Sequence, residues 1–223
     1  MSYQIHQLKV SFANFINYSY IIVDSATQKA ALVDPAWDYF KIDSIITRYH
    51  LQLTSILLTH SHFDHVNLVR PFVHQYNAQV FMSAKEIDYY KFRCPNLNQL
   101  QNSEIIQIGE TSVVGLETPG HTAGGMCLLL SASLFSGDTI FIEGCGICRT
   151  VGGDPQKMYN SLQFIKKNVD RDTKIYPGHS FGKKPGFSLE SIIKENIYFQ
   201  IESVEQFVAF RMRSRQSNPF AFK

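Results

Sequence analysis

Three histidines and one aspartate fall within the stretch Thr59-His-Ser-His-Phe-Asp-His65. Side chains two positions apart lie on different faces of a helix but on the same face of an extended chain, so His60 and His62 can close on one ion only where the chain is extended. The β-rich apolar run 55–58 predicts a strand before them, and residues 66–76 predict a helix after them. We therefore expect a metal site at a strand end, where an α/β sheet forms its ligand crevice.

Further potential ligands occur at other predicted junctions between strands and loops. Asp64 and His65 follow the first two histidines and can reach a second ion. A lone histidine is usually an ordinary polar residue, but a structural role does not need Asp or His at four separate junctions. His6, His50 and His74 are left over and are interpreted as surface or helix-face residues. The candidate metal ligands are His60, His62, Asp64, His65, His121, Asp138 and His179.

Composition restricts the other classes of function. The 223 residues are 44% hydrophobic and 18% charged, which suits a single domain spanning 1–223 with a proper core. A net charge of +2 without long runs of one sign gives no indication of nucleic-acid binding. No apolar stretch approaches membrane-spanning length, and four cysteines are too few for a disulfide scaffold. We expect a cytoplasmic protein with no membrane or nucleic-acid partner.

The pair Cys145 and Cys148 has the C-x-x-C spacing of redox and zinc sites. The helix and strand context of a thioredoxin unit is missing around it, so a redox or ligand role is the less favoured interpretation. Asp34 directly follows a predicted strand. It is interpreted either as support for a metal ligand or as a turn-capping residue.

The pattern along the chain predicts two groups of strands separated by helices. An antiparallel opening is expected first, a loop at 96–102, and a second sheet from residue 104. The segment 211–215 is expected to be a solvated end. Predicted strands are 3–10, 17–23, 29–33, 55–58, 78–82, 104–108, 111–117, 126–130 and 134–136, and predicted helices are 39–50, 66–76, 84–91, 156–169 and 189–213.

The ordered motif His60-x-His62-x-Asp64-His65, followed by His121, Asp138 and His179, resembles the metallo-β-lactamase superfamily over nearly the whole chain. The resemblance implies an α/β (α+β) fold, a four-layer αββα sandwich of two mixed sheets flanked by helices. It also implies that one metal ion is held by the first, second and fifth of these residues. Asp64, His65 and His179 would hold the other, and Asp138 would bridge both.

A pair of divalent cations would determine the chemistry of such a site. Cations about 3.5–4 Å apart lower the pKa of a shared water, giving a hydroxide that attacks a carbonyl polarised by a metal. Asp64 and Asp138 would be the catalytic carboxylates, because they neutralise the ions and orient the water. Ligands rich in nitrogen favour two Zn²⁺ ions per chain, with iron or manganese as alternatives.

Three loop motifs resemble the glyoxalase II branch, whose members hydrolyse acyl thioesters: Thr118-Pro-Gly-His-Thr-Ala-Gly-Gly, Phe135-Ser-Gly-Asp-Thr-Ile-Phe and Tyr176-Pro-Gly-His. Two further stretches, 11–20 and 144–155, are similar to zinc-dependent hydrolases of bacillaene-type trans-acyltransferase polyketide synthases. This resemblance implies an acyl group on the phosphopantetheine arm of an acyl carrier protein as the substrate.

The sequence departs from the glyoxalase II pattern at the triplet Cys-Gly-Arg or Cys-Gly-Lys, because Ile147 and Cys148 intervene before Arg149. Arg149, Lys183 and Lys184 are hypothesised to meet the phosphate of the arm or an acidic carrier surface. An ordinary solvated surface is the alternative for these three.

Other functions remain open at this stage. A mononuclear-iron persulfide dioxygenase has an overlapping ligand motif, and a hydroxyacylglutathione hydrolase of glyoxalase II type or an enzyme for lactones or β-lactams would keep hydrolysis with another substrate. A non-catalytic metal-stabilised module is disfavoured, because structural zinc sites are usually closed and mononuclear.

Overall fold

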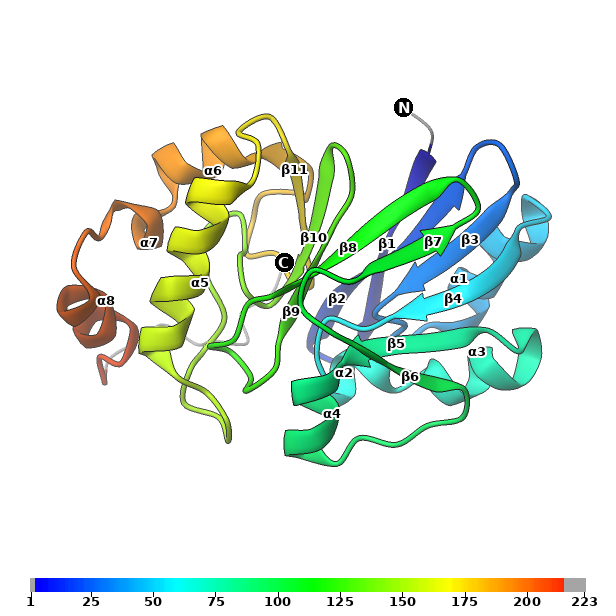
Figure 1. Ribbon diagram of the computed structural model, residues 1–223, viewed down its shortest axis with the longest axis horizontal. Helices are drawn as coiled ribbons and strands as arrows, with labels where there is room; N and C mark the ends of the chain where they lie inside the picture. Colours follow the sequence, from blue (N-terminus) through cyan, green and yellow to red (C-terminus); the bar gives the residue numbers. More distant parts are fainter. Residues whose placement is uncertain (1–2, 215–223) are drawn as a thin grey trace.

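Two six-stranded mixed sheets face each other in the computed structural model, which describes residues 3–214 (Figure 1). The first sheet has the order β1-β2-β3-β4-β5-β6, antiparallel from β1 to β3 and parallel from β3 to β6. Its strands are β1 (Tyr3–Phe12), β2 (Phe15–Asp24), β3 (Lys29–Val33), β4 (Gln52–Leu57), β5 (Gln79–Ser83) and β6 (Leu97–Leu100). The predicted antiparallel opening is therefore confirmed.

The second sheet has the order β12-β11-β10-β9-β8-β7 and begins at the position predicted for it. It is antiparallel except between β10 and β11, which are parallel. Its strands are β7 (Ile105–Ile108), β8 (Thr111–Glu117), β9 (Met126–Leu129), β10 (Ser133–Gly137), β11 (Lys174–Pro177) and β12 (Phe187–Ser188).

Helices cover the outer face of each sheet, as Figure 1 shows. On the first sheet they are α1 (Tyr39–Arg48), α2 (Phe63–Val66), α3 (Val69–Tyr76) and α4 (Ala84–Tyr90); on the second they are α5 (Pro155–Asn168), α6 (Leu189–Glu195), α7 (Ile197–Gln200) and α8 (Val204–Arg211).

Three hydrophobic clusters separate the layers. One packs α1, α3 and α4 on the first sheet, another packs α5 to α8 on the second, and the third lies between the sheets. Tyr20 and Leu57 from the first sheet meet Leu128 and Phe135 from the second in this central cluster. Burial of these apolar faces is what holds the sheets together. The predicted four-layer αββα sandwich is confirmed.

Three local predictions were wrong. Residues 97–100 form the edge strand β6 and not a loop, because their backbone pairs with β5 and Leu100 is buried. The predicted helix 189–213 is three helices, separated at Asn196, whose side chain caps α7, and at residues 201–203. Arg211 is buried against Tyr198, with 2.5 Å between Nη1 and the hydroxyl, so it is not part of a solvated end; Arg215 lies outside the described residues.

Within residues 3–214, no helix is both long and apolar enough to cross a bilayer. The leftover histidines match their prediction, because His50 and His74 are exposed and half-buried His6 packs its ring 4.9 Å from the ring of Tyr49.

Candidate metal centre

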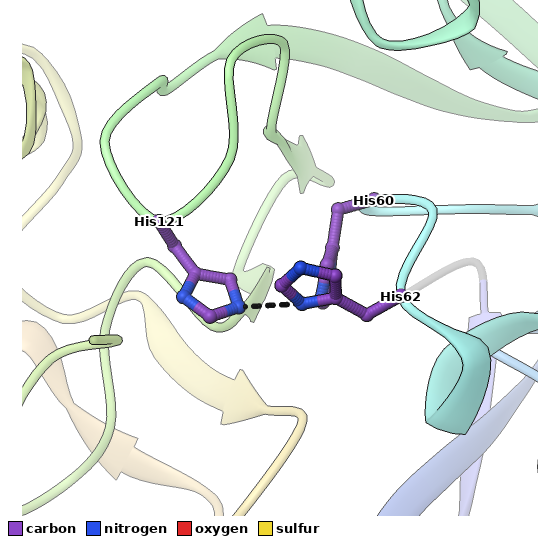
Figure 2. A group of neighbouring side chains, drawn as sticks. All are labelled: His60, His62 and His121. Atoms are coloured by element: carbon purple, nitrogen blue, oxygen red, sulfur yellow. Dashed lines mark hydrogen bonds between the residues drawn. The ribbon is translucent and has the colours of Figure 1, made fainter. Parts of the chain in front are cut away.

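Three histidines from two loops form the first group of potential ligands. His60 and His62 lie between β4 and α2, and His121 lies in the loop between β8 and β9. Figure 2 shows the three rings turned toward one another. One nitrogen of each lies within 4.8 Å of the others, and His121 Nε2 is 2.9 Å from His62 Nδ1. The first group therefore joins a loop of the first sheet to a loop of the second.

Asp64, His65 and His179 form the second group. Asp64 and His65 belong to α2, and His179 follows β11. The Nε2 atoms of the two histidines are 3.3 Å apart, and Asp64 Oδ2 lies 3.2 Å from His179 Nε2. Burial would raise the pKa of Asp64, but His65 and His179 hold it well below its usual range. Asp64 is therefore a carboxylate at neutral pH.

Asp138 lies between the two groups, just after β10. Its Oδ2 is 3.4 Å from His121 Nε2 and 3.6 Å from His179 Nε2, and its Oδ1 is 3.5 Å from His65 Nε2. One carboxylate thus contacts a histidine of the first group and two of the second. This placement fits the bridging role that the motif resemblance implied.

Hydrogen bonds outside the centre fix the orientation of the rings. His121 Nδ1 donates to the carbonyl of Ile147 at 2.7 Å, and His179 Nδ1 donates to the carbonyl of Ile16 at 2.7 Å. Because a carbonyl only accepts, both Nδ1 atoms carry a proton, and the Nε2 atom of each ring faces the centre.

Asp34 fixes the next two histidines. Its Oδ2 accepts from His65 Nδ1 at 3.0 Å and from the Thr59 hydroxyl at 2.6 Å, and its Oδ1 accepts from the Thr59 backbone at 2.9 Å. Thr59 Oγ1 is in turn 3.0 Å from His60 Nδ1, from which it accepts. Asp34 also lies close enough to His60 and His65 to form a third group, but its oxygens are already engaged. Its position supports the ligands, as one of the two sequence interpretations proposed.

The donor set fits metal cations. Within the described part of the chain, neither His60 Nε2 nor Asp138 Oδ1 has a hydrogen-bond partner, although both are buried. The Nε2 atoms of His65 and His179 also converge to 3.3 Å of each other. A cation between such groups removes the cost of the unpaired buried atoms. Imidazole with carboxylate is a donor set that suits zinc.

Protonation of the histidines differs across the centre. Burial lowers the pKa of His60 well below its usual range, and neighbouring imidazoles lower it further. Burial also lowers the pKa of His121 to about 4, although the charge of Asp138 opposes it. Burial would lower the pKa of His65 too, but Asp64 and Asp138 raise it to about 10. The metal-free second group therefore holds a proton that a metal ion must displace.

Sequence reasoning missed two side chains, one that bonds to a candidate ligand and one that bonds to the loop between His60 and His62. Buried Asn17 donates to the Asp64 backbone carbonyl at 2.8 Å and to Asp64 Oδ2 at 3.1 Å, and its Oδ1 accepts from Trp37 Nε1 at 2.6 Å. Buried Glu86 of α4 accepts hydrogen bonds from Ser61. Asn17 lies within the stretch 11–20 that carried a resemblance, whereas no sequence signal marks Glu86.

Aromatic side chains border the centre on the side of Asn17. The ring of Trp37 stacks on Phe12 at 5.6 Å between centroids and meets Phe63 edge-on at 5.9 Å. Phe12 is 65% exposed and Phe63 71% exposed. This aromatic rim (Phe12, Phe15, Trp37 and Phe63) offers apolar surface beside Asp64.

The predicted substrate-binding cations lie outside the two ligand groups. Exposed Arg149 donates to the backbone carbonyls of Met212 and Arg213, at the end of α8. Lys183 is ion-paired with Glu195, and Lys184 is exposed. A phosphate bound by Arg149 would therefore have to replace these two carbonyls as hydrogen-bond acceptors.

Cys145 and Cys148 are free, buried thiols, and no potential metal-ligand group among residues 3–214 includes them. Burial raises the pKa of Cys145 far above its usual range and that of Cys148 to about 12, although the charge of Arg211 opposes both shifts. Protonated, buried thiols are poor nucleophiles and poor ligands. This agrees with the sequence analysis, in which a redox role was the less favoured interpretation.

The sequence is similar to those of known hydrolases. The probable polyketide biosynthesis zinc-dependent hydrolase PksB of Bacillus subtilis is 49% identical over 223 residues, covering 100% of this chain and 99% of that protein. The corresponding probable hydrolase BaeB of Bacillus velezensis is 48% identical over 222 residues, covering 100% and 99%. A hydroxyacylglutathione hydrolase of Prochlorococcus marinus is 32% identical over 182 residues, covering 78% of this chain and 69% of that protein.

Solved structures agree on the fold. The crystal structure of ETHE1 from Myxococcus xanthus superposes with a TM-score of 0.86 at 26% identity, covering 97% of this chain and 93% of that one. The family model described as "Metallo-beta-lactamase superfamily" matches residues 14–179, which contain all seven candidate ligands. The chain belongs to the metallo-beta-lactamase superfamily, as a metal-dependent hydrolase.

Proposed function

We propose that this hydrolase uses two zinc ions to cleave acyl groups from the phosphopantetheine arm of an acyl carrier protein during polyketide biosynthesis. The observation that carries the proposal is the position of Asp138, within 3.6 Å of histidines from both ligand groups. A shared carboxylate is typical of sites that hold two cations side by side. The names of the relatives 49% and 48% identical support zinc and the pathway.

Each ligand group would hold one ion. His60, His62 and His121 are proposed for the first and Asp64, His65 and His179 for the second, with Asp138 shared. When bound, zinc supplies an acidified water as nucleophile and a Lewis acid for the thioester carbonyl. The groups that the chain itself contributes to the reaction are then the two carboxylates.

Asp64 and Asp138 are proposed to orient the attacking water. Both side chains are accessible to water in part, since Asp64 is 23% and Asp138 9% exposed at the side chain. A carboxylate is an acceptor and aligns a water by taking its hydrogen bond. Asn17 fixes one Asp64 oxygen by donating to it at 3.1 Å, which leaves the other free for this task.

The aromatic rim supports an apolar substrate. Phe63 precedes Asp64 directly, and Trp37 is tied to Asp64 through Asn17. Exposed aromatic surface next to reacting groups gains free energy by covering an apolar acyl chain. We propose that the acyl group lies over this rim while its thioester carbonyl enters the centre.

Arg149, Lys183 and Lys184 remain our proposed contacts for the phosphate of the arm or for an acidic carrier surface. Lys184 is exposed, and Lys183 can exchange Glu195 for a phosphate because both partners are solvent-accessible. The four free cysteines fit a reducing cytoplasmic location, where such carrier proteins would be met.

Metal analysis combined with two thioester substrates tests the proposal. Protein purified without chelator is analysed for metal, and hydrolysis is compared for an acyl group on a carrier-protein arm and for acyl-glutathione. About two zinc ions per chain and a higher kcat/KM for the carrier substrate are expected. A preference for acyl-glutathione would instead support hydroxyacylglutathione hydrolysis, the activity named for the relative that is 32% identical. One iron per chain with sulfur-dependent oxygen uptake would refute hydrolysis altogether.

A further inference from the structure

We propose that Glu86 is a positioning residue of the metal centre, whose carboxylate fastens the loop carrying His60 and His62 to the loop carrying His121. Glu86 belongs to α4 and is fully buried. The inference rests on the ligands of the proposed function but not on its substrate, so metal binding alone can test it.

The carboxylate bonds to both loops. Its Oε1 accepts from the Ser61 backbone N–H at 2.9 Å and from the Ser61 hydroxyl at 2.8 Å. Its Oε2 accepts from the Gly124 backbone N–H at 2.9 Å. Ser61 stands between His60 and His62, and Gly124 comes three residues after His121. One side chain thus fixes the backbone between His60 and His62 and the backbone three residues after His121.

Tyr90 reinforces this connection one helical turn later. Positions four apart share one face of a helix, so Glu86 and Tyr90 present their polar atoms to the same loops. The Tyr90 hydroxyl accepts from the Ala123 N–H at 3.3 Å and donates to the carbonyl of Val151 at 2.7 Å. Two successive N–H groups of the His121 loop therefore point at α4.

Close approach of the loop to α4 requires glycine at position 124. A Cβ atom there would lie 2.2 Å from the Glu86 backbone nitrogen and 2.6 Å from the Lys85 carbonyl carbon, and neither backbone atom can move aside cheaply. The loop backbone therefore rests on the helix backbone. This contact brings the Gly124 N–H within reach of the carboxylate.

Only a carboxylate satisfies the three donors. Among residues 3–214, no ion pair within 4 Å involves Glu86, so these three hydrogen bonds are what satisfies its buried carboxyl oxygens. An amide of the same shape has one oxygen and one NH₂ group. In Glu86→Gln, the glutamine NH₂ group would point either at the Ser61 donors or at the Gly124 N–H. Two donors cannot bond to each other, so at least one buried hydrogen bond would be lost in either orientation.

The Glu86 hydrogen bonds affect the distances among the three histidines of the first ligand group. His60 and His62 come from the first sheet and His121 from the second, so their separation depends on how the two halves are held. Metal affinity is sensitive to such supports, with losses of about 10- to 100-fold when outer partners of ligands are removed. Loss of the Glu86 bonds is expected to weaken the first group and to leave the second group intact.

Zn²⁺ titration against a competing chromophoric chelator tests this in two backgrounds. His179→Ala leaves only the first group complete, and His62→Ala leaves only the second. Glu86→Gln is expected to weaken Zn²⁺ binding about 10-fold or more in the first background, and less than about threefold in the second.

Asp24→Asn is the matched control. Asp24 is also a buried carboxylate that joins the two sheets, accepting from Thr27 and, at 2.7 Å, from the hydroxyl of Thr111. It is not part of any ligand group among the described residues. Asp24→Asn is expected to lower the unfolding temperature while leaving Zn²⁺ affinity within about threefold in both backgrounds.

The proposal would be overturned if Glu86→Gln weakened Zn²⁺ binding equally in both backgrounds. It would also be overturned if Asp24→Asn weakened Zn²⁺ binding as much as Glu86→Gln does. Either result would mean that the substitution loosens the whole fold and not the first ligand group. Unchanged affinity in Glu86→Gln would overturn it as well. Ser61→Ala provides a milder second variant, which keeps the carboxylate and removes one hydrogen bond. It is expected to weaken Zn²⁺ binding by the first group about fivefold, the value of one ordinary hydrogen bond; no change would count against Glu86.

Discussion

Replacement of Asn17 by alanine should destabilise the metal-free protein and disturb Asp64. The change removes a hydrogen bond to the Asp64 carbonyl, one to its carboxylate, and one from Trp37 Nε1. Neutral hydrogen bonds contribute about 1 kcal/mol each, and one to a carboxylate contributes about 2 kcal/mol, so full loss would cost about 4 kcal/mol. Because Asp64 is 23% exposed and water can replace part of the loss, we expect about 2 kcal/mol.

Urea unfolding with chelator present measures this free energy. With a slope of about 3 kcal/mol/M, a loss of about 2 kcal/mol lowers the midpoint by about 0.7 M. Trp37 is the only tryptophan of the chain, so its fluorescence follows both unfolding and the loss of its bond to Asn17. Zn²⁺ affinity of the second ligand group should fall about 10-fold, because Asp64 loses its anchor.

Asn98→Ala is the control for this experiment. The Asn98 amide also donates three hydrogen bonds, to Gln79, Val80 and Asn96, but it lies on the edge strand β6. It should lower the midpoint without changing Trp37 emission in the folded state or Zn²⁺ affinity. If Asn17→Ala unfolds at the wild-type urea concentration, or if both variants change Zn²⁺ affinity equally, the reasoning about Asn17 is refuted.

Further predictions concern the ligands, the pH dependence and the substrate. His62→Ala or Asp138→Ala should lower kcat/KM by about two orders of magnitude or more, with metal loss measurable by atomic absorption; full activity after exhaustive metal removal would contradict the mechanism. The metal-free protein should gain stability as pH rises from about 4 to 6.5, because in this range His121 is neutral in the folded protein and protonated in the unfolded chain. Urea midpoints measured across this pH range test it. The metal-free protein should lose stability again from 6.5 to about 10, where folded His65 releases its proton, and a flat profile over this range would exclude the charged form of His65. Phe63→Ala should raise KM about tenfold for long acyl thioesters but little for acetyl ones, whereas equal effects on both would argue against the aromatic rim.

The convergence of the candidate ligands was predictable because their spacing is governed by backbone geometry. His60 and His62 alternate in an extended segment, and His121, Asp138 and His179 each follow a strand. Strand ends of a sandwich meet at one edge, so short motifs separated by long stretches still converge. The resemblance to the metallo-β-lactamase superfamily implied the order of layers, and the two batches of strands with intervening helices were consistent with it.

Features decided by tertiary contacts were not predictable. The edge strand β6 has the composition of a loop, and only backbone pairing with β5 makes it a strand. Arg211 looked like part of a charged tail, but the hydroxyl of Tyr198 and the surrounding α-helices give it a buried partner. Glu86 has the ordinary appearance of a helix-surface glutamate, because its partners Ser61 and Gly124 are 25 and 38 residues away. A pattern read along one segment contains no information about such contacts.

The position of the centre between two sheets makes metal binding and folding interdependent. His60 and Asp138 carry buried polar atoms without hydrogen-bond partners in the described chain, so the metal-free centre costs stability at the junction of the sheets. A cation bound by His62 of the first half and His121 of the second would remove that cost and cross-link the two halves. Glu86 would hold the same junction without metal, since its carboxylate accepts from Ser61 of the first half and from Gly124 of the second, whereas the Asp34 carboxylate bonds to Thr59 and His65, both of the first half. The chain itself therefore contributes to the geometry of the first ligand group, and a bound metal ion would add to the stability of the fold.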